Sequence, residues 1–243
     1  MSESIAVQRP STLLLSFNQD FECFSAGCDD GFRLYNTHPV KEIERCELGG
    51  GIAVAEMLFR SNYLALVGGG RRSAFPPNKL IVWDCSVGKA VIELEMEGRV
   101  LGARLRRDCI VVLEGGMITT YTFSDIPHQI AQWRCWPSEK ALCSLSNSSE
   151  HPLIAFPSSS GAGWVEVRRL AKSLAESPDH WKLVKFKAHS HELQALAFNA
   201  YGTMVATASE KGTLVRVFDA MRGTILREFR RGSNPARISW WGY

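Results

Sequence analysis

The sequence predicts an all-β protein, a β-propeller built from four-stranded blades of the WD-repeat type. Apolar and polar residues alternate with period two in short runs bounded by Gly, Asn and Asp, as is typical of strands joined by hairpin turns. A strand carrying an aromatic and a polar residue also recurs every 38 to 52 residues. A period of about 40–50 residues with about four strands indicates propeller blades. The recurrences centre on Tyr35, Trp83, Tyr121, Glu166 and Phe218.

We expect five such blades in one domain, 1–243, and helical periodicity is almost absent. The blades are predicted to span residues 12–48, 53–97, 98–137, 140–187 and 190–232. A turn-rich loop, 68–78, interrupts the second blade, and a polar connector, 170–182, precedes the fifth. Residues 233–243 are expected to begin a sixth blade that the chain does not complete. Because a propeller protects its edges only when the ring closes, five blades predict an open or incomplete ring.

The fifth blade is the clearest. It reads as strands Leu193–Asn199, Met204–Ser209 and Thr213–Asp219, followed by a last strand that ends in Phe-Arg-Arg-Gly. Successive side chains of a strand point to opposite faces of the sheet. Arg230 and Arg231 are therefore predicted to reach two different neighbours, and one strand could serve two anion sites.

Composition narrows the function classes. Hydrophobic residues make up 45% and charged residues 22%, as in ordinary globular proteins. A net charge of +3 is too small to indicate nucleic acid as a partner. From Ala171 onward, however, 11 Lys and Arg stand against 6 Asp and Glu. A local excess of this kind suits a phosphate group or an anionic membrane surface.

Several sites and segments are not expected. The seven Cys include no C-x-x-C pair and no zinc-ligand spacing, so we interpret them as reduced thiols of a cytosolic protein without a metal or other cofactor. We find no signal peptide and no apolar run long enough for a transmembrane segment. The G-x-S-x-G, H-E-x-x-H and paired-carboxylate motifs are also missing, and the protein is not expected to be an enzyme.

Six motifs resemble the PROPPIN family, the phosphoinositide-binding WD-repeat β-propellers of autophagy. In order along residues 12–235 they are SNYLALVGGG, PPNKLIVWD, LRRDCIVVLEGGMITTYTF, HPLIAFP, ATASEKGTLVRVFD and EFRRG. The compact form looks closest to the small, core-only branch of that family, shortened at its C-terminal end. The family fold has seven blades, so the resemblance implies that the sixth blade, with its membrane-inserting loop, has no counterpart here.

The resemblance implies two headgroup sites that meet at the Phe-Arg-Arg-Gly motif. Carried over by motif, the first site consists of His189, Thr207, Ser209, Gly212, Thr213, Arg216 and Arg230. Arg231 and Gly232 would open the second site. Arg guanidinium groups donate two hydrogen bonds to one phosphate, hydroxyls and Gly let a ligand approach closely, and His189 would be a stronger donor when protonated.

Each of these residues also has an ordinary structural interpretation. Thr207, Ser209 and Thr213 suit strands and turns by propensity alone. Two consecutive Arg at a strand end can simply keep a sheet edge solvated. His189 follows Ala188 in the manner of the capping Gly-His of other propellers, where the His is structural.

The resemblance also implies a function and partners. It implies a peripheral effector that binds phosphatidylinositol 3-phosphate or the 3,5-bisphosphate on phagophore, endosomal or vacuolar membranes and recruits autophagy machinery. It implies that Asn18 and Asp20, in the turn after the first strand, contact an autophagy lipid-transfer protein. The alternative is a WD-repeat interaction scaffold with little or no lipid binding, because blades six and seven are missing.

Overall fold

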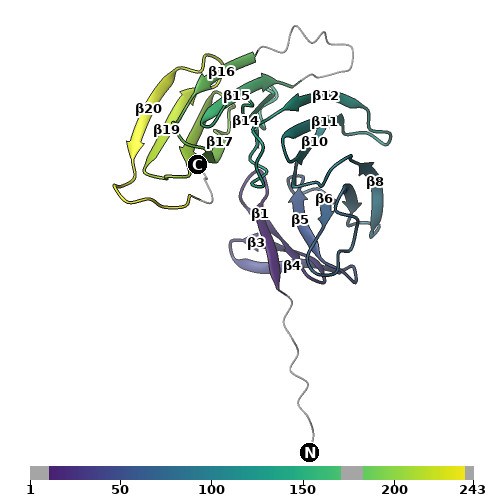
Figure 1. Ribbon diagram of the computed structural model, residues 1–243. Helices are drawn as coiled ribbons and strands as arrows, with labels where there is room; N and C mark the ends of the chain where they lie inside the picture. Colours follow the sequence, from purple (N-terminus) through teal and green to yellow (C-terminus); the bar gives the residue numbers. More distant parts are fainter. Residues whose placement is uncertain (1–10, 171–182, 239–243) are drawn as a thin grey trace, which may run out of the picture. The chain divides into compact units, whose positions relative to one another are not determined.

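The computed structural model describes residues 11–170 and 183–238 of the 243-residue chain (Figure 1). Within these residues all regular structure is β, and the strands form five four-stranded antiparallel sheets without a helix. The predicted all-β fold with five four-stranded blades is therefore confirmed. The chain divides into two compact units, residues 1–100 and 101–243.

The first unit contains two sheets, each with its strands in sequence order. The strands of the first sheet are β1 (Thr12–Phe17), β2 (Cys23–Cys28), β3 (Gly31–Thr37) and β4 (Val40–Glu47). Those of the second are β5 (Ile52–Met57), β6 (Tyr63–Gly68), β7 (Lys79–Asp84) and β8 (Lys89–Glu95). β5 thus starts one residue before the predicted second blade.

The second unit contains three sheets of the same plan. The third sheet has β9 (Gly102–Arg106), β10 (Cys109–Glu114), β11 (Met117–Thr122) and β12 (Gln129–Arg134). The fourth has β13 (Ser144–Leu145), β14 (Leu153–Pro157), β15 (Trp164–Arg169) and β16 (Leu183–Lys187). The fifth has β17 (Leu193–Phe198), β18 (Met204–Ser209), β19 (Leu214–Asp219) and β20 (Ile225–Arg230).

The aromatic residue of the sequence repeat marks a bulge between the third and fourth strands. The pairing register shifts at Tyr35, Trp83, Tyr121 and Phe218, in four of the five sheets. The fourth sheet has Glu166 in the repeat instead of an aromatic residue, and β15 pairs with β16 without a shift. The recurring residue therefore reports a local backbone feature that bends the outer strand.

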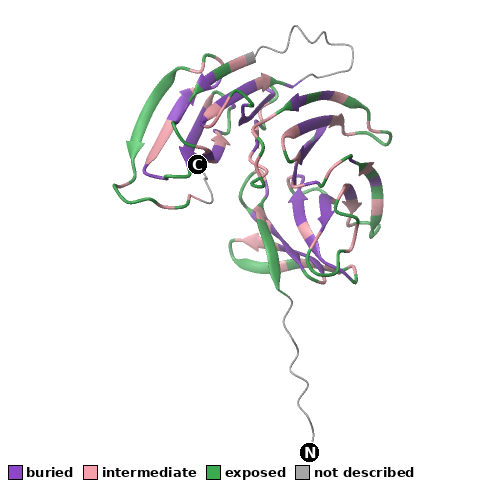
Figure 2. Ribbon diagram, viewed as in Figure 1, coloured by how far each residue is buried: buried purple, intermediate pink, exposed green. Residues whose placement is uncertain are grey.

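Burial differs between the inner and outer strands of a sheet. The second strands β6 and β10 are buried almost throughout, whereas the fourth strands β4, β8 and β20 are largely exposed (Figure 2). Neighbouring sheets pack face to face within each unit. One apolar cluster joins the first and second sheets, a second joins the third and fourth, and a third joins the fourth and fifth.

Some predictions fall outside the described residues. The connector was predicted over 170–182, and of this only Leu170 is described. Trp240 and Trp241, at the end of the predicted sixth blade, also lie outside. Residues 233–238 contain no strand. The single domain and the open ring remain predictions.

Phe156 offers a test of the packing between the third and fourth sheets. Its side chain is fully buried and stacks on Trp133, with the ring centroids 6.0 Å apart. We expect Phe156→Ala to lower the free energy of unfolding by about 3–5 kcal/mol in urea titrations, because it leaves a cavity. Ile126→Ala, at a side chain that is 72% exposed, should cost less than about 0.5 kcal/mol. Equal effects of the two variants would contradict the packing described here.

Candidate functional site

A row of three polar side chains crosses the fifth sheet. Thr207 on β18 lies directly opposite Arg216 on β19, and Arg216 lies directly opposite Glu228 on β20. Residues that pair directly across antiparallel strands project from the same face. Val205 and Phe218, two positions along on that face, belong to the cluster shared with the fourth sheet. The row therefore lies on the face that packs toward the fourth sheet.

His189 forms the buried end of this row. It lies just before β17 and is only 5% exposed. Its Nε2 is 3.0 Å from the Thr207 hydroxyl, which donates to the carbonyl oxygen of Arg216 at 3.3 Å. Since the hydroxyl has a single proton, we assign the proton between the two side chains to Nε2, so that the imidazole donates and Thr207 accepts.

Burial and the nearby Arg216 charge together lower the pKa of His189 to about 4. The imidazole is therefore neutral near pH 7. The expectation that His189 strengthens the site when protonated does not fit this environment, because protonation would place a charge in a buried position beside a guanidinium group. The geometry instead gives His189 the role of fixing the Thr207 hydroxyl.

Arg216 is held from two sides. Its Nη1 donates to the carbonyl oxygen of Ala188 at 2.5 Å, and its Nε donates to the Glu228 carboxylate at 2.7 Å. Among the described residues Nη2 has no hydrogen-bond partner. The guanidinium plane is thus fixed while one edge keeps donors that an anion could use.

The turn between β18 and β19 places Ser209, Gly212 and Thr213 at the end of the same sheet. Ser209 and Thr213 are both less than a tenth exposed. Gly212 has φ +61°, and a Cβ there would collide with the carbonyl oxygen of Ala236. Both the backbone conformation and the close approach therefore require glycine at this position.

The two arginines of the Phe-Arg-Arg-Gly motif differ sharply. Arg230 pairs opposite Leu214, two positions from Glu228, so it projects from the face that carries Arg216. It is exposed and forms no ion pair with any described residue. Arg231 instead donates to the carbonyl oxygens of Gly212 at 2.7 Å and Asn234 at 2.6 Å. The structure thus leaves Arg230 available to a ligand and uses Arg231 to hold the chain after β20.

The remaining residues expected from the sequence are Gly232 and the two predicted partner contacts. A Cβ at Gly232 would meet no atom within 4 Å, so packing does not require glycine there. Asn18, in the β1–β2 turn, is buried, and its side chain is hydrogen-bonded to the backbone of Cys23 and Phe59. Asp20 in the same turn is accessible and lies 3.8 Å from Arg60. Of the two predicted partner contacts, only Asp20 presents its side chain.

Sequence reasoning missed Glu228. The signal was present, because Glu228 stands two residues before Arg230 and period two puts both on one face. Its pairing with Arg216 depends on the bulge between Val217 and Phe218, which sequence alone did not locate.

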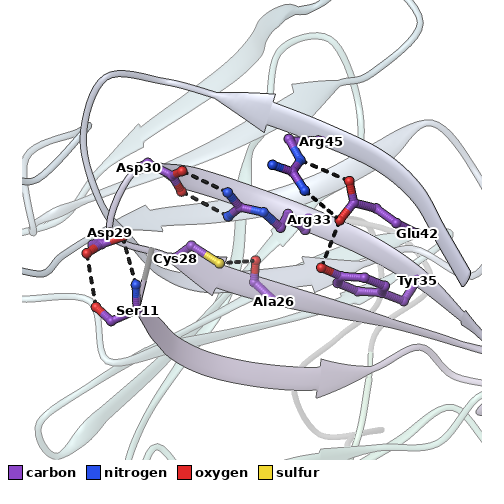
Figure 3. A network of polar contacts seen from close by, with 9 residues as sticks. All are labelled: Ser11, Ala26, Cys28, Asp29, Asp30, Arg33, Tyr35, Glu42 and Arg45. Carbon is purple, nitrogen blue, oxygen red and sulfur yellow. Dashed lines mark hydrogen bonds and ion pairs between the residues drawn. The ribbon is translucent and has the colours of Figure 1, made fainter. Parts of the chain in front are cut away.

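The first sheet shows a related arrangement in which the central arginine is already paired with a carboxylate (Figure 3). Matching bulges between the first two strands align Ala26 with Thr207, and Arg33, which pairs with Ala26, then corresponds to Arg216. Both terminal nitrogens of Arg33 donate to Asp30, at 2.7 and 2.9 Å, and this contact lowers the pKa of the Asp30 carboxyl. Arg33 is 5% exposed. Both terminal nitrogens of Arg33 are therefore already engaged by the Asp30 carboxylate.

Comparison with known proteins decides the family. A family model described as PROPPIN matches residues 12–238. The chain belongs to the PROPPIN family. PROPPINs are autophagy-related, phosphoinositide-binding β-propellers, and the resemblance noted in the sequence is confirmed.

Individual relatives agree with this assignment. SVP1-like protein 2 from Saccharomyces cerevisiae is 34% identical over 258 residues, covering 95% of this chain and 58% of that protein. Autophagy-related protein 18e from Arabidopsis thaliana is 36% identical over 231 residues, covering 93% and 59% respectively. The solved structure of Kluyveromyces lactis Hsv2 with its complete loop 6CD matches with a TM-score of 0.80 and 29% identity, over 93% of this chain and 65% of that one. The chain thus spans less than two thirds of these relatives.

The pKa of His189 predicts a pH effect on stability. A histidine whose pKa is lower in the folded than in the unfolded state stabilises the fold above pH 6.5, and this stabilisation is lost as the pH falls toward 4. We expect the free energy of unfolding to fall by about 2 kcal/mol less in His189→Gln than in the wild type between pH 7.5 and 5. Equal pH dependence would mean that the imidazole is not held neutral by burial.

The contacts of the two arginines predict different effects on stability. Arg231→Thr should lower the free energy of unfolding by about 1–2 kcal/mol, because two hydrogen bonds to backbone carbonyls are lost. Arg230→Thr should change it by less than about 0.5 kcal/mol. Thermal or urea unfolding of the two variants measures the difference, and a larger effect at Arg230 would contradict the assignment.

Proposed function

We propose that this chain is a phosphoinositide-binding module that associates peripherally with membranes and acts in autophagy. The observation that carries the proposal is Arg230, which is exposed, forms no ion pair with a described residue and lies on the same face of the fifth sheet as Arg216. Two guanidinium groups on one face suit a phosphate, since Arg230 can donate two parallel hydrogen bonds to its oxygens and Arg216 keeps the donors of Nη2. Membership of the PROPPIN family supports the same ligand class.

The proposed ligand is the headgroup of phosphatidylinositol 3-phosphate or of the 3,5-bisphosphate. Arg230 and the free edge of Arg216 would bind the phosphate, with Ser209 and Thr213 lining the turn beside them. His189 and Thr207 would hold the floor of the site through their hydrogen bond. The hydrogen bond of Arg216 to the Ala188 carbonyl oxygen restrains the guanidinium group before a ligand arrives, which favours binding.

The wider cellular role is part of the proposal. We propose that the chain works at phagophore, endosomal or vacuolar membranes from the cytoplasmic side and recruits autophagy machinery, including a lipid-transfer protein that contacts the turn around Asp20. Among the described residues no helix is available to cross a membrane. The proposed function is binding rather than catalysis.

Arg231 and Gly232 would belong to a second headgroup site. Two sites on one rigid body increase membrane affinity through effective concentration. A chain that carries only the first site should bind weakly and lose binding as salt screens the guanidinium charges. The hydrogen bonds of Arg231 to Gly212 and Asn234 would have to open before Arg231 could bind a phosphate.

Vesicle flotation tests the proposal. The 243-residue chain should float with vesicles that contain phosphatidylinositol 3-phosphate and not with vesicles of phosphatidylcholine alone. Arg230→Thr should weaken this binding about tenfold or more, because it removes a charge-assisted contact without disturbing the fold. Binding should also fall between 0.1 and about 0.5 M salt.

The Arg230→Thr control is cleaner than a double variant with Arg231→Thr, since Arg231 has structural hydrogen bonds. Folding of each variant is checked by thermal unfolding. A folded wild-type chain that does not float would overturn the lipid-binding function. It would leave the WD-repeat interaction scaffold as the better account.

A further inference from the structure

Glu228 occupies the Nε edge of the Arg216 guanidinium group, beside the free edge that the proposed ligand would contact. Its carboxylate accepts from Arg216 Nε at 2.7 Å, and Glu228 lies on the same face as Arg230. A carboxylate and a phosphate offer the same kind of oxygen acceptors to a guanidinium group. An acidic residue between two arginines lowers the affinity for any anion, so its position in the row requires an explanation.

The exposure of the pair indicates that it can open. The side chains of Arg216 and Glu228 are 28% and 45% exposed. Ion pairs that reach solvent contribute little, because water and salt compete for both charges. Glu228 lies on β20, whose six residues are all exposed, so its carboxylate can turn into water while the backbone stays in place.

A buried pair in the fourth sheet shows the opposite arrangement. Glu166 on β15 is 2% exposed and accepts from Arg168 at 2.6 Å and from Ser158 at 3.1 Å. Lys185 on β16 adds an ion pair at 3.1 Å. Removing a partner from such a carboxylate would leave a buried charge uncompensated. The Glu166 group is therefore a fixed structural element, whereas the Glu228 carboxylate is exchangeable.

The formal charges of the site and of the headgroup determine which ligands can displace Glu228. Arg216, Arg230 and Glu228 together carry +1, and +2 when the carboxylate has turned away. A phosphodiester headgroup such as that of phosphatidylserine offers a single negative charge on its phosphate. A phosphomonoester carries about −1.5 to −2 near pH 7. Only the more highly charged group gains enough from Arg216 to compete with a carboxylate already in contact with it.

We propose that Glu228 is a specificity-determining residue that occupies Arg216 until a phosphomonoester displaces it. The site thereby selects phosphorylated inositol headgroups over monoanionic phosphodiesters. This inference rests on the proposed function and adds the residue responsible for discrimination. Specificity comes from the Glu228 carboxylate, which disfavours binding of the monoanionic phosphodiesters.

Glu228→Gln tests the inference, because it keeps the size of the side chain and removes its charge. The full chain is assayed by flotation with vesicles containing phosphatidylinositol 3-phosphate or phosphatidylserine at equal mole fraction. We expect binding to phosphatidylserine to rise about threefold or more in the variant, while binding to phosphatidylinositol 3-phosphate is kept or increased. The preference of the wild type for the phosphomonoester should fall accordingly.

Glu93→Gln is the matched control. Glu93 lies on β8, the fourth strand of the second sheet, and forms an exposed ion pair with Lys79 at 3.5 Å. Its substitution changes the net charge equally and should leave the preference unchanged.

Soluble inositol 1,3-bisphosphate, titrated calorimetrically, separates binding of the free phosphate from attraction to a charged vesicle surface. Its affinity should be kept or increased in Glu228→Gln.

The outcomes distinguish the two proposals. In one outcome the wild type binds phosphatidylinositol 3-phosphate while Glu228→Gln keeps the same preference for it over phosphatidylserine. That result would overturn only the role of Glu228. Weaker binding of the variant to both the vesicle and the soluble headgroup would also overturn it, since Glu228 would then position Arg216 for the ligand. A folded wild type that binds neither probe would overturn the proposed function and this inference with it.

Discussion

The pairing register between third and fourth strands decides where the charged side chains of each sheet lie. In the fifth sheet Val217 pairs with Arg227 and Phe218 with Ile225, so Leu226 is the extra residue of a bulge. After this bulge Glu228 falls opposite Arg216, and Arg230 follows on the same face. Without the extra residue Arg227 would fall opposite Arg216 and Phe229 opposite Leu214, and Glu228 and Arg230 would turn to the opposite face. The composition of the proposed site depends on this one irregularity.

Local patterns were sufficient to predict the fold. Period-two alternation reports strands, and the aromatic residues at Tyr35, Trp83, Tyr121 and Phe218 recur because the bulges recur. The candidate site was only partly predictable. Its residue types followed from the resemblance, but the neutral state of His189 depends on burial by residues distant in sequence. The different contacts of Arg230 and Arg231 depend on the β18–β19 turn at Gly212. Arg231 donates to the Gly212 carbonyl oxygen, and the chain after β20 returns so that the Ala236 carbonyl oxygen lies close to Gly212.

The first and fifth sheets carry an arginine at the same position of the third strand, and its charge is balanced in different ways. Arg33 in the first sheet is itself buried and is neutralised through two hydrogen bonds by Asp30, in the turn between β2 and β3. Arg216 in the fifth sheet is neutralised across the strand pair, by Glu228 on the exposed outer strand. A turn carboxylate held by two hydrogen bonds is costly to displace. The position of the neutralising acid therefore distinguishes Arg33, a structural arginine, from Arg216, the arginine of the proposed site.

The fourth and fifth sheets carry the same pair with its signs exchanged. In the fourth sheet the third-strand residue is Glu166 and its outer-strand partner is Lys185; in the fifth they are Arg216 and Glu228. Third-strand side chains are held by the packing between sheets, while outer-strand side chains can turn into solvent. Loss of the outer partner would leave a fixed anion in the fourth sheet and a fixed cation in the fifth. Of these two sheets the fifth would therefore suit the proposed phosphate ligand, because a guanidinium group still held by the Ala188 carbonyl loses less conformational freedom when it binds an anion.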